Sequence, residues 1–502
     1  MMNHLFKAIS AYAQQDPTRE AIVTDADTVN YAQLKSLVEQ LHTELMKLEI
    51  QRLALWCVNS SDWIIVDLAA QLAGVTVIPI PLFFTPEQVR HLLQDSQADI
   101  LCVTQKTGDT PQWLMDVIGE ITNSQIALPI HAHGKFFHLT HHQTLQQGLV
   151  SSLNQQLAKI TYTSGSTGTP KGVCLEEDTI ESITHSLSRS LASSQLGRHL
   201  CLIPFATLLE NIAGIYVALN MGRSVVVGEV SQFGLISNHS FDAQRFVEAV
   251  RNYQIESVIL LPQMLKAIVE YIAKHELADY STLKFIAVGG GKVSPDLLKQ
   301  CEALNLPVYE GYGLSECASV VSLNLPGARK IGSVGRILPH VKVEIAENSE
   351  VVVKGNAMLG YVHEPAATPY IHTGDAGYFD EDGYLYITGR IKQLIISSFG
   401  RNISPEWVES NSLTEPEIQQ IAIFGEAQPY LSAVIYAAGS TPDQLLEAAI
   451  QRANTRMPDY AQIKHWCRAS EPFSLNNQML TDNGKLRRQQ IQQHFQTALA
   501  QH

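Results

Sequence analysis

The chain has 502 residues, of which 45% are hydrophobic and 17% charged, so its composition indicates a globular protein with more than one core and excludes a disordered chain. The formal net charge is -14 and no basic stripe occurs, which argues against a nucleic-acid partner. Seven cysteines without a CxxC pair argue against a disulfide framework or a cysteine-bound zinc ion.

The N-terminal residues 1–23 contain no long apolar core and no cleavage signal, which together with the cysteine pattern predicts a cytoplasmic protein. Residues 63–84 are the most apolar stretch of the chain. Because Asp67, Pro79 and Pro81 interrupt this stretch, we expect a buried helix and strand there and no stable membrane span.

Helix-like and strand-like patterns alternate through the first three-quarters of the chain. The spacing of apolar residues predicts helices over residues 31–48 and 86–96. Short apolar runs predict strands over residues 53–58, 75–80, 100–104, 224–227, 257–261 and 285–288. This alternation predicts an α/β fold with a large N-terminal domain of helix-covered, mostly parallel sheets.

Strand-like runs without intervening helices follow at residues 341–345, 350–353 and 384–387 and predict a β-rich subdomain. Residues 389–393 are a candidate boundary, beyond which strands are expected over residues 421–424 and 432–436. A helix over residues 442–456 and a polar C-terminal helix complete a small α+β unit. We therefore expect an N-terminal domain over residues 1–390 and a mobile C-terminal lid domain over residues 391–502.

The first chemical motif is ITYTSGSTGTPKG at residues 160–172, where a loop rich in glycine and hydroxyl groups follows an apolar strand. Glycine lets backbone N–H groups approach phosphate oxygens, and Ser and Thr hydroxyls add hydrogen-bond donors. The motif is not a Walker loop, because its lysine follows a proline, and this argues against a P-loop GTPase or kinase. A flexible surface loop is the alternative interpretation.

Four further strings follow in chain order: YEGYGLSE at residues 309–316, YIHTGD at 370–375, GRIKQLIISSFGRNISPEWVE at 389–409 and LTDNGKLRR at 480–488. Together with the first loop they resemble the motifs of the acyl-adenylate-forming (AMP-binding) superfamily over nearly the whole chain. The likeness extends to bacterial fatty-acid acyl-CoA synthetases and acyl-carrier-protein ligases. It implies an enzyme that uses ATP and Mg²⁺ to activate a small-molecule carboxylic acid.

The resemblance implies a nucleotide site made by the glycine-rich loop and by the glycines after the strand at residues 285–288. The residues that it assigns to this site are Thr163, Ser164, Gly165, Ser166, Thr167, Gly168, Lys171, Gly290 and Gly291. Lys292, directly after these glycines, departs from the apolar residue that is usual in the family and alters the pocket.

The next two motifs are assigned to the adenosine and the phosphates. By resemblance, Tyr312 stacks on adenine beside Gly313, which suits an aromatic ring. Ser315 contacts the α-phosphate, and Glu316 helps to hold Mg²⁺, a hard cation that prefers oxygen ligands. The alternative interpretation of this string is a turn with a solvated Glu.

The string at residues 370–375 and the arginine that follows it are assigned to the ribose. By resemblance, Asp375 accepts hydrogen bonds from both ribose hydroxyls, and Arg390 supports the ribose and phosphate. The alternatives are a turn Asp and a surface Arg.

The last two motifs concern the movement of the small domain and catalysis. By resemblance, Lys392 is the hinge, although Gln393 departs from the acidic residue that is common after it. Gly400 lines the tunnel for the thiol acceptor. Lys485 bridges the substrate carboxylate and the α-phosphate, so Lys485, Thr163 and Glu316 are the predicted catalytic residues. A lone lysine near a terminus is otherwise a solvated charge.

The identity of the acid is predicted from residues 203–214, IPFATLLENIAG, which lack the Asp that pairs with the ammonium of amino acid substrates. A medium- or long-chain fatty acid is favoured, although Thr207 stands where fatty-acid enzymes often have His or an aromatic residue. Gly214 and Gly290 leave room for an acyl tunnel. Activation of an aryl or other small acid, and a non-catalytic nucleotide-binding relative, remain as alternatives.

The acceptor is coenzyme A or the phosphopantetheine arm of an acyl-carrier protein, since both present the same thiol. Arg401, Arg487 and Arg488 are candidates for contacts with the 3′-phosphate of coenzyme A. A His-rich stretch at residues 131–142 lacks a Cys or carboxylate at ligand spacing, so we expect a solvated loop there rather than a metal site.

Overall fold

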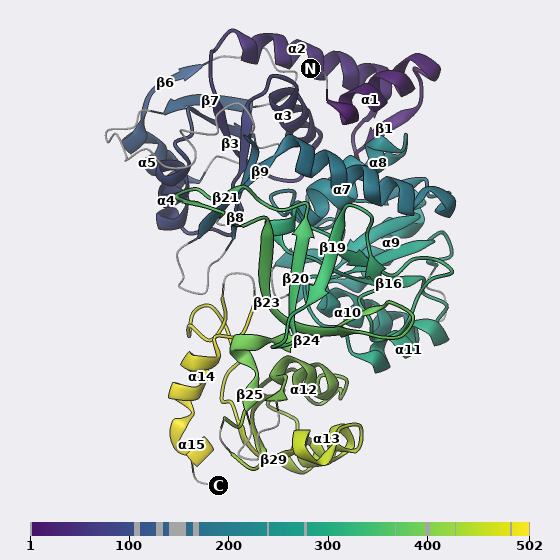
Figure 1. Cartoon of the computed structure of the whole chain (residues 1–502), viewed down its shortest axis with the longest axis vertical. Coiled ribbons are helices and arrows are strands. Elements are labelled where there is room, and N and C mark those ends of the chain that lie inside the picture. Colours follow the sequence, from purple (N-terminus) through teal and green to yellow (C-terminus); the bar gives the residue numbers. More distant parts are fainter. Residues whose placement is uncertain are drawn as a thin grey trace.

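The computed structural model describes residues 3–104, 111–126, 134–139, 157–163, 170–237, 240–275, 279–366, 368–396, 402–426, 428–481 and 484–500, and the structural statements below refer to these residues. Figure 1 shows a large N-terminal unit and a smaller C-terminal unit that lies below it in the view. Among the described residues, no helix combines the length and the apolar character that crossing a bilayer requires.

Two nine-stranded sheets form the frame of the large unit. The first sheet has the order β18 (Arg336–Ile337), β17 (Ser322–Leu323), β16 (Val308–Tyr312), β15 (Phe285–Val288), β14 (Ser257–Leu260), β10 (Arg198–Leu200), β11 (Ser224–Val226), β1 (Glu20–Val23) and β2 (Thr28–Asn30). The second sheet has the order β22 (Glu364–Pro365), β21 (Gly360–Tyr361), β9 (Lys171–Glu176), β8 (Leu157–Thr163), β4 (Thr76–Pro79), β3 (Arg52–Cys57), β5 (Ile100–Thr104), β7 (Gly134–Leu139) and β6 (Thr122–Ile126). The central strands of both sheets pair in parallel, which confirms the predicted sheet type.

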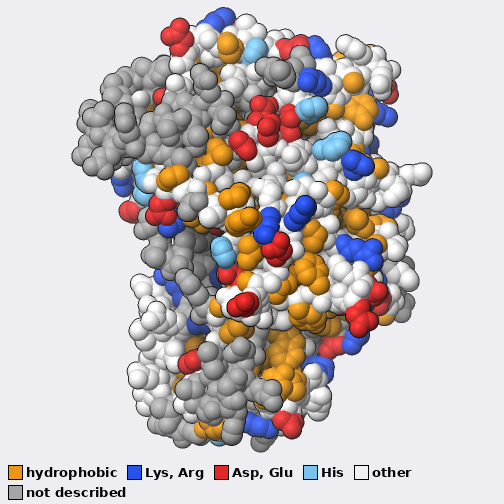
Figure 2. Space-filling view, viewed as in Figure 1, with side chains coloured by type: hydrophobic (Ala, Val, Ile, Leu, Met, Phe, Trp, Pro, Cys, Tyr) orange, Lys and Arg blue, Asp and Glu red, His pale blue; other side chains and the backbone are white. Residues whose placement is uncertain are grey.

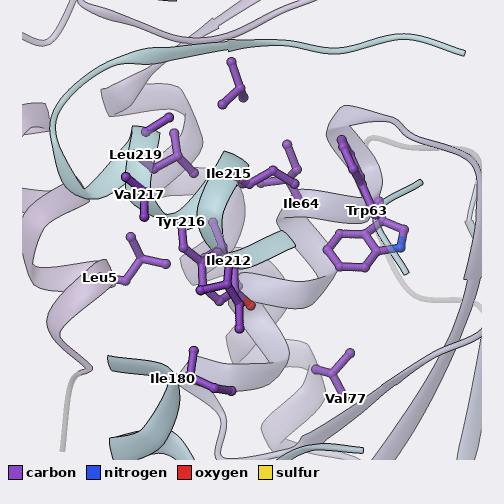
Figure 3. Close-up of a cluster of buried hydrophobic side chains, with 14 of the residues drawn as sticks. Leu5, Trp63, Ile64, Val77, Ile180, Ile212, Ile215, Tyr216, Val217 and Leu219 are labelled. Atoms are coloured by element: carbon purple, nitrogen blue, oxygen red, sulfur yellow. The ribbon is translucent and has the colours of Figure 1, made fainter. Parts of the chain in front are cut away.

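A layer of helices lies between the two sheets and makes the largest core. Its members are α1 (His4–Gln15), α2 (Tyr31–Met46), α3 (Ser61–Leu72), α7 (Glu177–Ser190), the π-helix η2 (Leu209–Tyr216) and α8 (Val217–Asn220). Figure 3 shows Ile64 of α3 and Ile212 and Ile215 of η2 gathered with Leu5 of α1 and Ile180 of α7. Burying each such side chain contributes about 1.5–3 kcal/mol before entropy is counted.

Two further groups of helices cover the outer faces of the sheets. The helices α9 (Ala243–Tyr253), α10 (Pro262–Lys274) and α11 (Pro295–Ala303) pack on the first sheet. The helices α4 (Pro86–Ser96) and α5 (Gln112–Ile121) pack on the second sheet. The large unit is therefore a stack of alternating helical and sheet layers, which requires the apolar strands that the sequence shows.

Local sequence explains where the two helices predicted over residues 31–48 and 86–96 begin. Asn30 caps α2, and Gln33 returns a hydrogen bond to the backbone of Asn30. Thr85 and Gln88 make the same capping box at α4, where Pro86 occupies the first turn. These caps satisfy backbone N–H groups that would otherwise lack a partner.

A buried ion pair joins the second sheet to the central helices. Lys159 of β8 lies with its Nζ 2.8 Å from Asp67 Oδ1 of α3, and both side chains are almost completely buried. Lys159 also donates to Asn211 and Tyr216 of η2, at 2.6 and 3.1 Å. Burial lowers the pKa of Lys159, and the charge of Asp67 opposes this decrease.

The predicted β-rich subdomain is an antiparallel sheet of β19 (Val341–Ile345), β20 (Glu350–Gly355), β23 (Tyr370–Phe379) and β24 (Leu385–Arg390). A short 3-10 turn, η4 (Ile391–Gln393), follows β24 and leads to the C-terminal unit. That unit packs the sheet β27 (Gln420–Phe424), β28 (Leu431–Tyr436) and β29 (Ile463–Arg468) against α12 (Pro405–Ser412) and α13 (Asp443–Thr455). It ends with α14 (Arg488–His494) and α15 (Gln496–Ala500), as the polar C-terminal pattern predicted.

One local prediction is wrong. Within the His-rich stretch, where a solvated loop was expected, residues 134–139 form β7 and pair with β5 and β6. Phe137 of this strand is 5% exposed and packs in the core beneath α4 and α5. Phe136, Phe137 and Leu139 carry the apolar signal of this strand, which the flanking histidines obscure. Residues 131–133 and 140–142 lie outside the described residues.

Candidate active site

A cleft with a volume of 2970 Å³ is lined by the first large sheet, the four-stranded sheet and the C-terminal unit. The parallel strands β14, β15 and β16 end at this cleft, which is where open α/β sheets bind ligands. The sequence-predicted residues that line it are Thr163, Lys171, Gly290, Gly291, Tyr312, Gly313, Ser315, Glu316, Asp375, Arg390 and Lys485. Residues from six separate motifs of the sequence thus converge on one cavity.

The described part of the structure does not show the side chains of the remaining predicted residues. Ser164, Gly165, Ser166, Thr167, Gly168 and Gly400 lie outside the described residues. The backbone of Lys392 lies in η4, between β24 and the C-terminal unit, and its side chain is outside the described part. Their roles stay predictions.

Tyr312 and Asp375 are joined directly. The Tyr312 hydroxyl, at the end of β16, donates a hydrogen bond of 2.6 Å to Asp375 Oδ2. Arg390 lies opposite Asp375 in the antiparallel pairing of β23 and β24, and its Nε is 2.9 Å from Asp375 Oδ1. Burial raises the pKa of Asp375, while Arg390 and the Tyr312 hydrogen bond oppose that increase. The result is a buried acceptor beside an aromatic ring.

The backbone before Asp375 is fixed by its own hydrogen bonds. Gly374 has a φ of +69°, and its N–H donates to Glu350 Oε1 at 2.9 Å. The N–H of Asp375 donates to the Thr373 hydroxyl at 3.0 Å, and Arg390 donates to the Thr373 carbonyl at 2.8 Å. These contacts hold the carboxylate of Asp375 toward the cleft, and Gly374 is needed because other residues avoid this φ.

Glycines also permit close backbone approach at the end of the parallel strands. A Cβ on Gly313 would lie 1.6 Å from the Ser319 carbonyl oxygen, so no other residue fits without a backbone shift. A Cβ on Gly291 would meet only Pro262, at 3.5 Å, so the backbone after β15 is open toward the cleft. The backbone at Gly291 is therefore accessible to a ligand in the cleft that Tyr312 also lines.

Glu316 and Lys171 face each other across Tyr361. The Tyr361 hydroxyl donates to Glu316 Oε1 at 3.0 Å, and Lys171 Nζ lies 5.0 Å from the Tyr361 ring centroid. Lys171 is also 3.6 Å from Glu364 in an exposed ion pair. Because only one oxygen of Glu316 is used by Tyr361, the carboxylate has capacity for a hard cation, whose preferred ligands are oxygens. The residue types therefore fit Mg²⁺.

Lys485 stands on a tight turn of the C-terminal unit. Thr481 accepts the Lys485 N–H on its hydroxyl at 3.0 Å and donates its own N–H to the Lys485 carbonyl at 2.8 Å. Gly484, with a φ of +73°, completes this turn before the bridge between Leu480 and Leu486. The Lys485 side chain is exposed, and its charge acts on Asp375 across the cleft.

Sequence interpretation did not foresee the buried carboxyl group that lies beside the predicted glycines. Lys292 donates to the Ile387 carbonyl at 3.2 Å, and Glu310 lies on the neighbouring strand β16, 6% exposed. Within the described residues, Glu310 Oε2 has no hydrogen-bond partner. Burial raises the pKa of Glu310 to about 8, with the Val293 N–H and Lys292 opposing the increase. Lys292 stood out in the sequence as unusual for the family, but no sequence signal pointed to Glu310.

A second unforeseen cluster lies deeper along the cleft. His199 of β10 has its Nε2 2.8 Å from Glu210 Oε1 and its Nδ1 3.1 Å from the Ser257 hydroxyl. Cys201 brings a third metal-ligand type within 4.8 Å of these atoms. Glu210 Oε2, however, already accepts backbone N–H groups from Leu202 and Ile203. The cluster therefore fastens the turn after β10 to η2 by hydrogen bonds.

Charge on the outer surface is mixed. On the face drawn in Figure 2, Lys and Arg side chains lie interspersed with Asp and Glu, and hydrophobic side chains gather toward the lower centre. This face therefore offers no uniform basic field of the kind that binds a nucleic-acid backbone.

Two family models match the chain, one in the large unit and one in the small unit. Residues 9–363 match the model of the AMP-binding enzyme family, and residues 392–502 match that of the AMP-binding enzyme C-terminal domain. An oxalate–CoA ligase of Arabidopsis thaliana is 27% identical over 96% of this chain and 97% of its own length. A 2-succinylbenzoate–CoA ligase of Enterococcus faecalis is 27% identical over 84% of this chain and 85% of its own length.

A solved structure has the same fold. The o-succinylbenzoate CoA synthetase (MenE) from Bacillus subtilis, in complex with its acyl-adenylate intermediate, superposes with a TM-score of 0.74. The alignment covers 98% of each chain at 20% sequence identity. The layered large unit and the small C-terminal unit thus recur together in that structure.

Proposed function

The chain belongs to the AMP-binding enzyme family, and we propose that it is an AMP-forming ligase that joins a carboxylic acid to coenzyme A. The observation that carries this proposal is the convergence of Tyr312, Asp375, Arg390 and Lys485 on one cleft from four separate segments. An aromatic ring, a buried carboxylate and two cations are the groups that an adenylate requires.

The proposed reaction has two steps. In the first, an oxygen of the substrate carboxylate attacks the α-phosphorus of ATP, the bond to the bridging oxygen breaks, and pyrophosphate leaves. In the second, the thiol of coenzyme A attacks the acyl carbon, the bond to the AMP oxygen breaks, and the thiol proton passes to solvent. A carboxylic acid is already ionised near neutral pH, so the first step needs positioning and charge stabilisation and no general base.

The nucleotide is placed by the residues at the ends of β15, β16 and β23. Adenine lies between Gly290 and Gly291 on one side and the Tyr312 ring on the other, with Gly313 beside it. The ribose hydroxyls donate to Asp375, which keeps its orientation through Arg390. Tyr312 and Arg390 each use one acceptor site of Asp375, so the ribose hydroxyls donate to the remaining lone pair of each oxygen.

The phosphates are held by hydroxyl groups and lysines. Thr163 and Lys171 line the cleft at the two ends of the loop whose residues Ser164–Gly168 we assign to the same role. Ser315 lies one residue before Glu316 in a 3-10 turn at the cleft and is assigned to the α-phosphate. Lys485 stabilises the charge that develops during adenylation. A Mg²⁺ ion held by Glu316 would neutralise part of the phosphate charge.

The second step uses a different orientation of the C-terminal unit. We place the domain boundary after Arg390, with Lys392 as the hinge and domains over residues 1–390 and 391–502. The match to the C-terminal domain model begins at residue 392, which supports a boundary at this point. Rotation about η4 removes Lys485 and brings the Gly400 loop to guide the thiol.

An aryl or other small carboxylic acid is the first candidate substrate. The two relatives named above act on oxalate and on 2-succinylbenzoate, as their names state, whereas another relative is named a long-chain-fatty-acid–CoA ligase. The first two relatives favour a small acid over the fatty acid that the sequence motifs suggested. They equally support coenzyme A as the acceptor, in preference to an acyl-carrier protein.

A fatty acid is the second candidate, because the cleft continues into the core between η2, α7 and the first sheet. The walls there include Leu187, Leu191, Val217 and Phe285, none of which is more than 6% exposed although all line the cavity. An apolar branch of this kind suits an alkyl chain as well as a ring.

Acid-dependent exchange of labelled pyrophosphate into ATP tests the proposal. The panel holds aryl, dicarboxylic, fatty and amino acids, without a thiol. Exchange with aryl or dicarboxylic acids, followed by thioester formation on adding coenzyme A, is the expected result. Exchange with fatty acids alone supports the second candidate. No exchange with any acid, in a protein that binds AMP, overturns the proposal in favour of a non-catalytic nucleotide binder.

A further inference from the structure

The two units touch along a seam whose contacts are polar and specific, and Lys266 and Leu413 of this seam also line the cleft. On the large unit the seam involves Asp296, in the first turn of α11, and Lys266 of α10. On the small unit it involves Arg456, which caps the C-terminal end of α13, and Leu413, which caps α12. None of these four residues belongs to a motif from which the function was inferred.

Arg456 is held in a fixed position by its own unit. Its Nη2 donates to the Asn411 carbonyl at 3.0 Å and to the Thr414 hydroxyl at 2.8 Å, and it lies 2.8 Å from Glu415 Oε1. The Nε faces the other way, 3.3 Å from Asp296 Oδ2 of the large unit. Because the guanidinium is already oriented, the contact across the seam costs little additional side-chain entropy.

Lys266 makes the second contact across the seam. Its ammonium group donates to the Leu413 carbonyl, at the C-terminal end of α12. A cation at this end of a helix satisfies an otherwise free carbonyl and interacts favourably with the helix dipole. Burial lowers the pKa of Lys266, and Glu270 one turn along α10 opposes that decrease.

A series of contacts within the small unit connects the seam to the turn that carries Lys485. Helix α12 is capped at its start by Ser404 and at its end by Leu413, which lies at the seam. Its buried Glu409 accepts a bidentate pair from Arg488, with Nη2 2.6 Å from Oε2, and also the Ile423 N–H at 2.8 Å. Arg488 follows the turn that carries Lys485 by three residues. A displacement of α12 therefore moves the catalytic lysine with it.

We infer that Arg456 and Lys266 are positioning residues, which dock the small unit on Asp296 and Leu413 in the orientation that presents Lys485 to the nucleotide. The inference rests on the proposed two-step function. Both contacts must break when the small unit rotates for thiol transfer, so the seam favours the first half-reaction over the second. Partly exposed ion pairs are weak enough to permit that exchange.

The test separates the two half-reactions in the full chain. Asp296→Asn and Lys266→Met each remove a contact across the seam, and Asp296→Lys sets two cations against each other. We expect pyrophosphate exchange to fall about threefold to tenfold for the first two variants and further for the third. Thioester formation from supplied acyl-adenylate and coenzyme A should be unchanged or faster in all three.

Two matched controls remove neighbouring charges that do not cross the seam. Lys299 pairs with Asp296 at 3.0 Å within α11, and Arg452 pairs with Glu415 at 2.6 Å within the small unit. Lys299→Gln and Arg452→Gln should leave the ratio of the two half-reactions as in the unaltered chain. Lys266→Arg, which keeps a charged donor, should restore most of the exchange that Lys266→Met loses.

Equal losses in both half-reactions, or the same change in the controls, would overturn the inference. A second readout is independent of activity. It is the distance between nitroxide labels attached to cysteines introduced at Lys274 and Gln451, with Cys467, which is only partly buried, replaced by serine. Asp296→Lys should broaden this distance distribution while the melting temperature stays within a few degrees. If the unaltered chain exchanges pyrophosphate with no acid, the proposed function fails, whereas an unchanged label distance in Asp296→Lys contradicts the docking.

Discussion

The hydroxyl of Tyr312 donates to Asp375 Oδ2 at 2.6 Å, which links a ring at the end of β16 to a carboxylate on β23. The two residues are 63 positions apart and belong to different sheets. Under the proposed assignment, recognition of the base and of the ribose is therefore coupled, because a shift of either side chain strains the same hydrogen bond.

Asp375→Asn should weaken ATP binding more than Tyr312→Phe does. The first change removes the charge that Arg390 pairs with, and charge-assisted hydrogen bonds contribute about 1.5–3 kcal/mol, or about tenfold to a hundredfold in affinity. The second keeps the aromatic face and loses only a hydroxyl, so we expect a change of a few-fold. The measurement is the ATP concentration that gives half-maximal pyrophosphate exchange. Equal effects would mean that the charge of Asp375 has no special role.

Lys485→Ala should reduce adenylate formation by about a hundredfold or more, the usual effect of removing one donor that stabilises a developing negative charge. Thioester formation from supplied acyl-adenylate should stay within a few-fold of the unaltered chain. Lys464, an exposed lysine of β29 that contacts Gln462, is the matched control on the same unit. A comparable loss in both half-reactions would remove Lys485 from its assigned role.

Lys159→Met should destabilise the large unit by about 3–5 kcal/mol, because it leaves the Asp67 carboxylate buried without its cation. The double change Lys159→Met with Asp67→Leu should be less destabilising than Lys159→Met alone, since no charge is then left buried. Urea unfolding at constant pH measures both. Lys35→Met, which breaks the more exposed pair with Glu39 at 2.6 Å, should cost less than about 1 kcal/mol.

Glu310→Gln should be more stable relative to the unaltered chain at pH 8.5 than at pH 5.5. Burial raises the pKa of Glu310 to about 8 in the folded chain, above the ordinary value of 4.5. The folded state therefore holds a proton that the unfolded state releases, and this contribution to stability is full below about pH 4.5 and is lost as the pH rises through about 8. The neutral amide does not titrate, so the free energy of unfolding of Glu310→Gln relative to the unaltered chain should increase with pH.

The midpoint of urea unfolding at the two pH values measures this difference for Glu310→Gln. The control is Glu381→Gln in the exposed turn between β23 and β24, which should give the same difference from the unaltered chain at both pH values. A Glu310→Gln advantage that does not grow with pH contradicts the raised pKa.

Much of the fold follows from local sequence. Alternating short apolar runs and amphipathic segments predicted β3, β4, β5, β14 and β15 within a residue or two, because buried parallel strands require continuous apolar side chains. Capping residues such as Asn30 and Thr85 mark the start of their helices. The strand β7 was missed, since histidines around Phe136 and Phe137 concealed its alternation.

The family of the chain could also be predicted from the sequence, because each motif is a short string to which one role is assigned: glycines for close approach, Tyr312 for a base and Asp375 for a diol. These strings do not show which of their side chains contact one another in the folded chain. The hydrogen bond from Tyr312 to Asp375, the contact of Tyr361 with Glu316, and the burial of Glu310 all join residues from different segments.

The sequence by itself determined the fold class, the order of the two units and the set of candidate nucleotide-binding residues, since these depend on periodicity and on contiguous motifs. Only the tertiary structure decided which distant residues meet. Lys159 with Asp67, and Arg456 with Asp296, are 92 and 160 positions apart. Ionic contacts of this kind leave no periodic signal in the chain, because their energy depends on distance and burial, which only the packed layers establish.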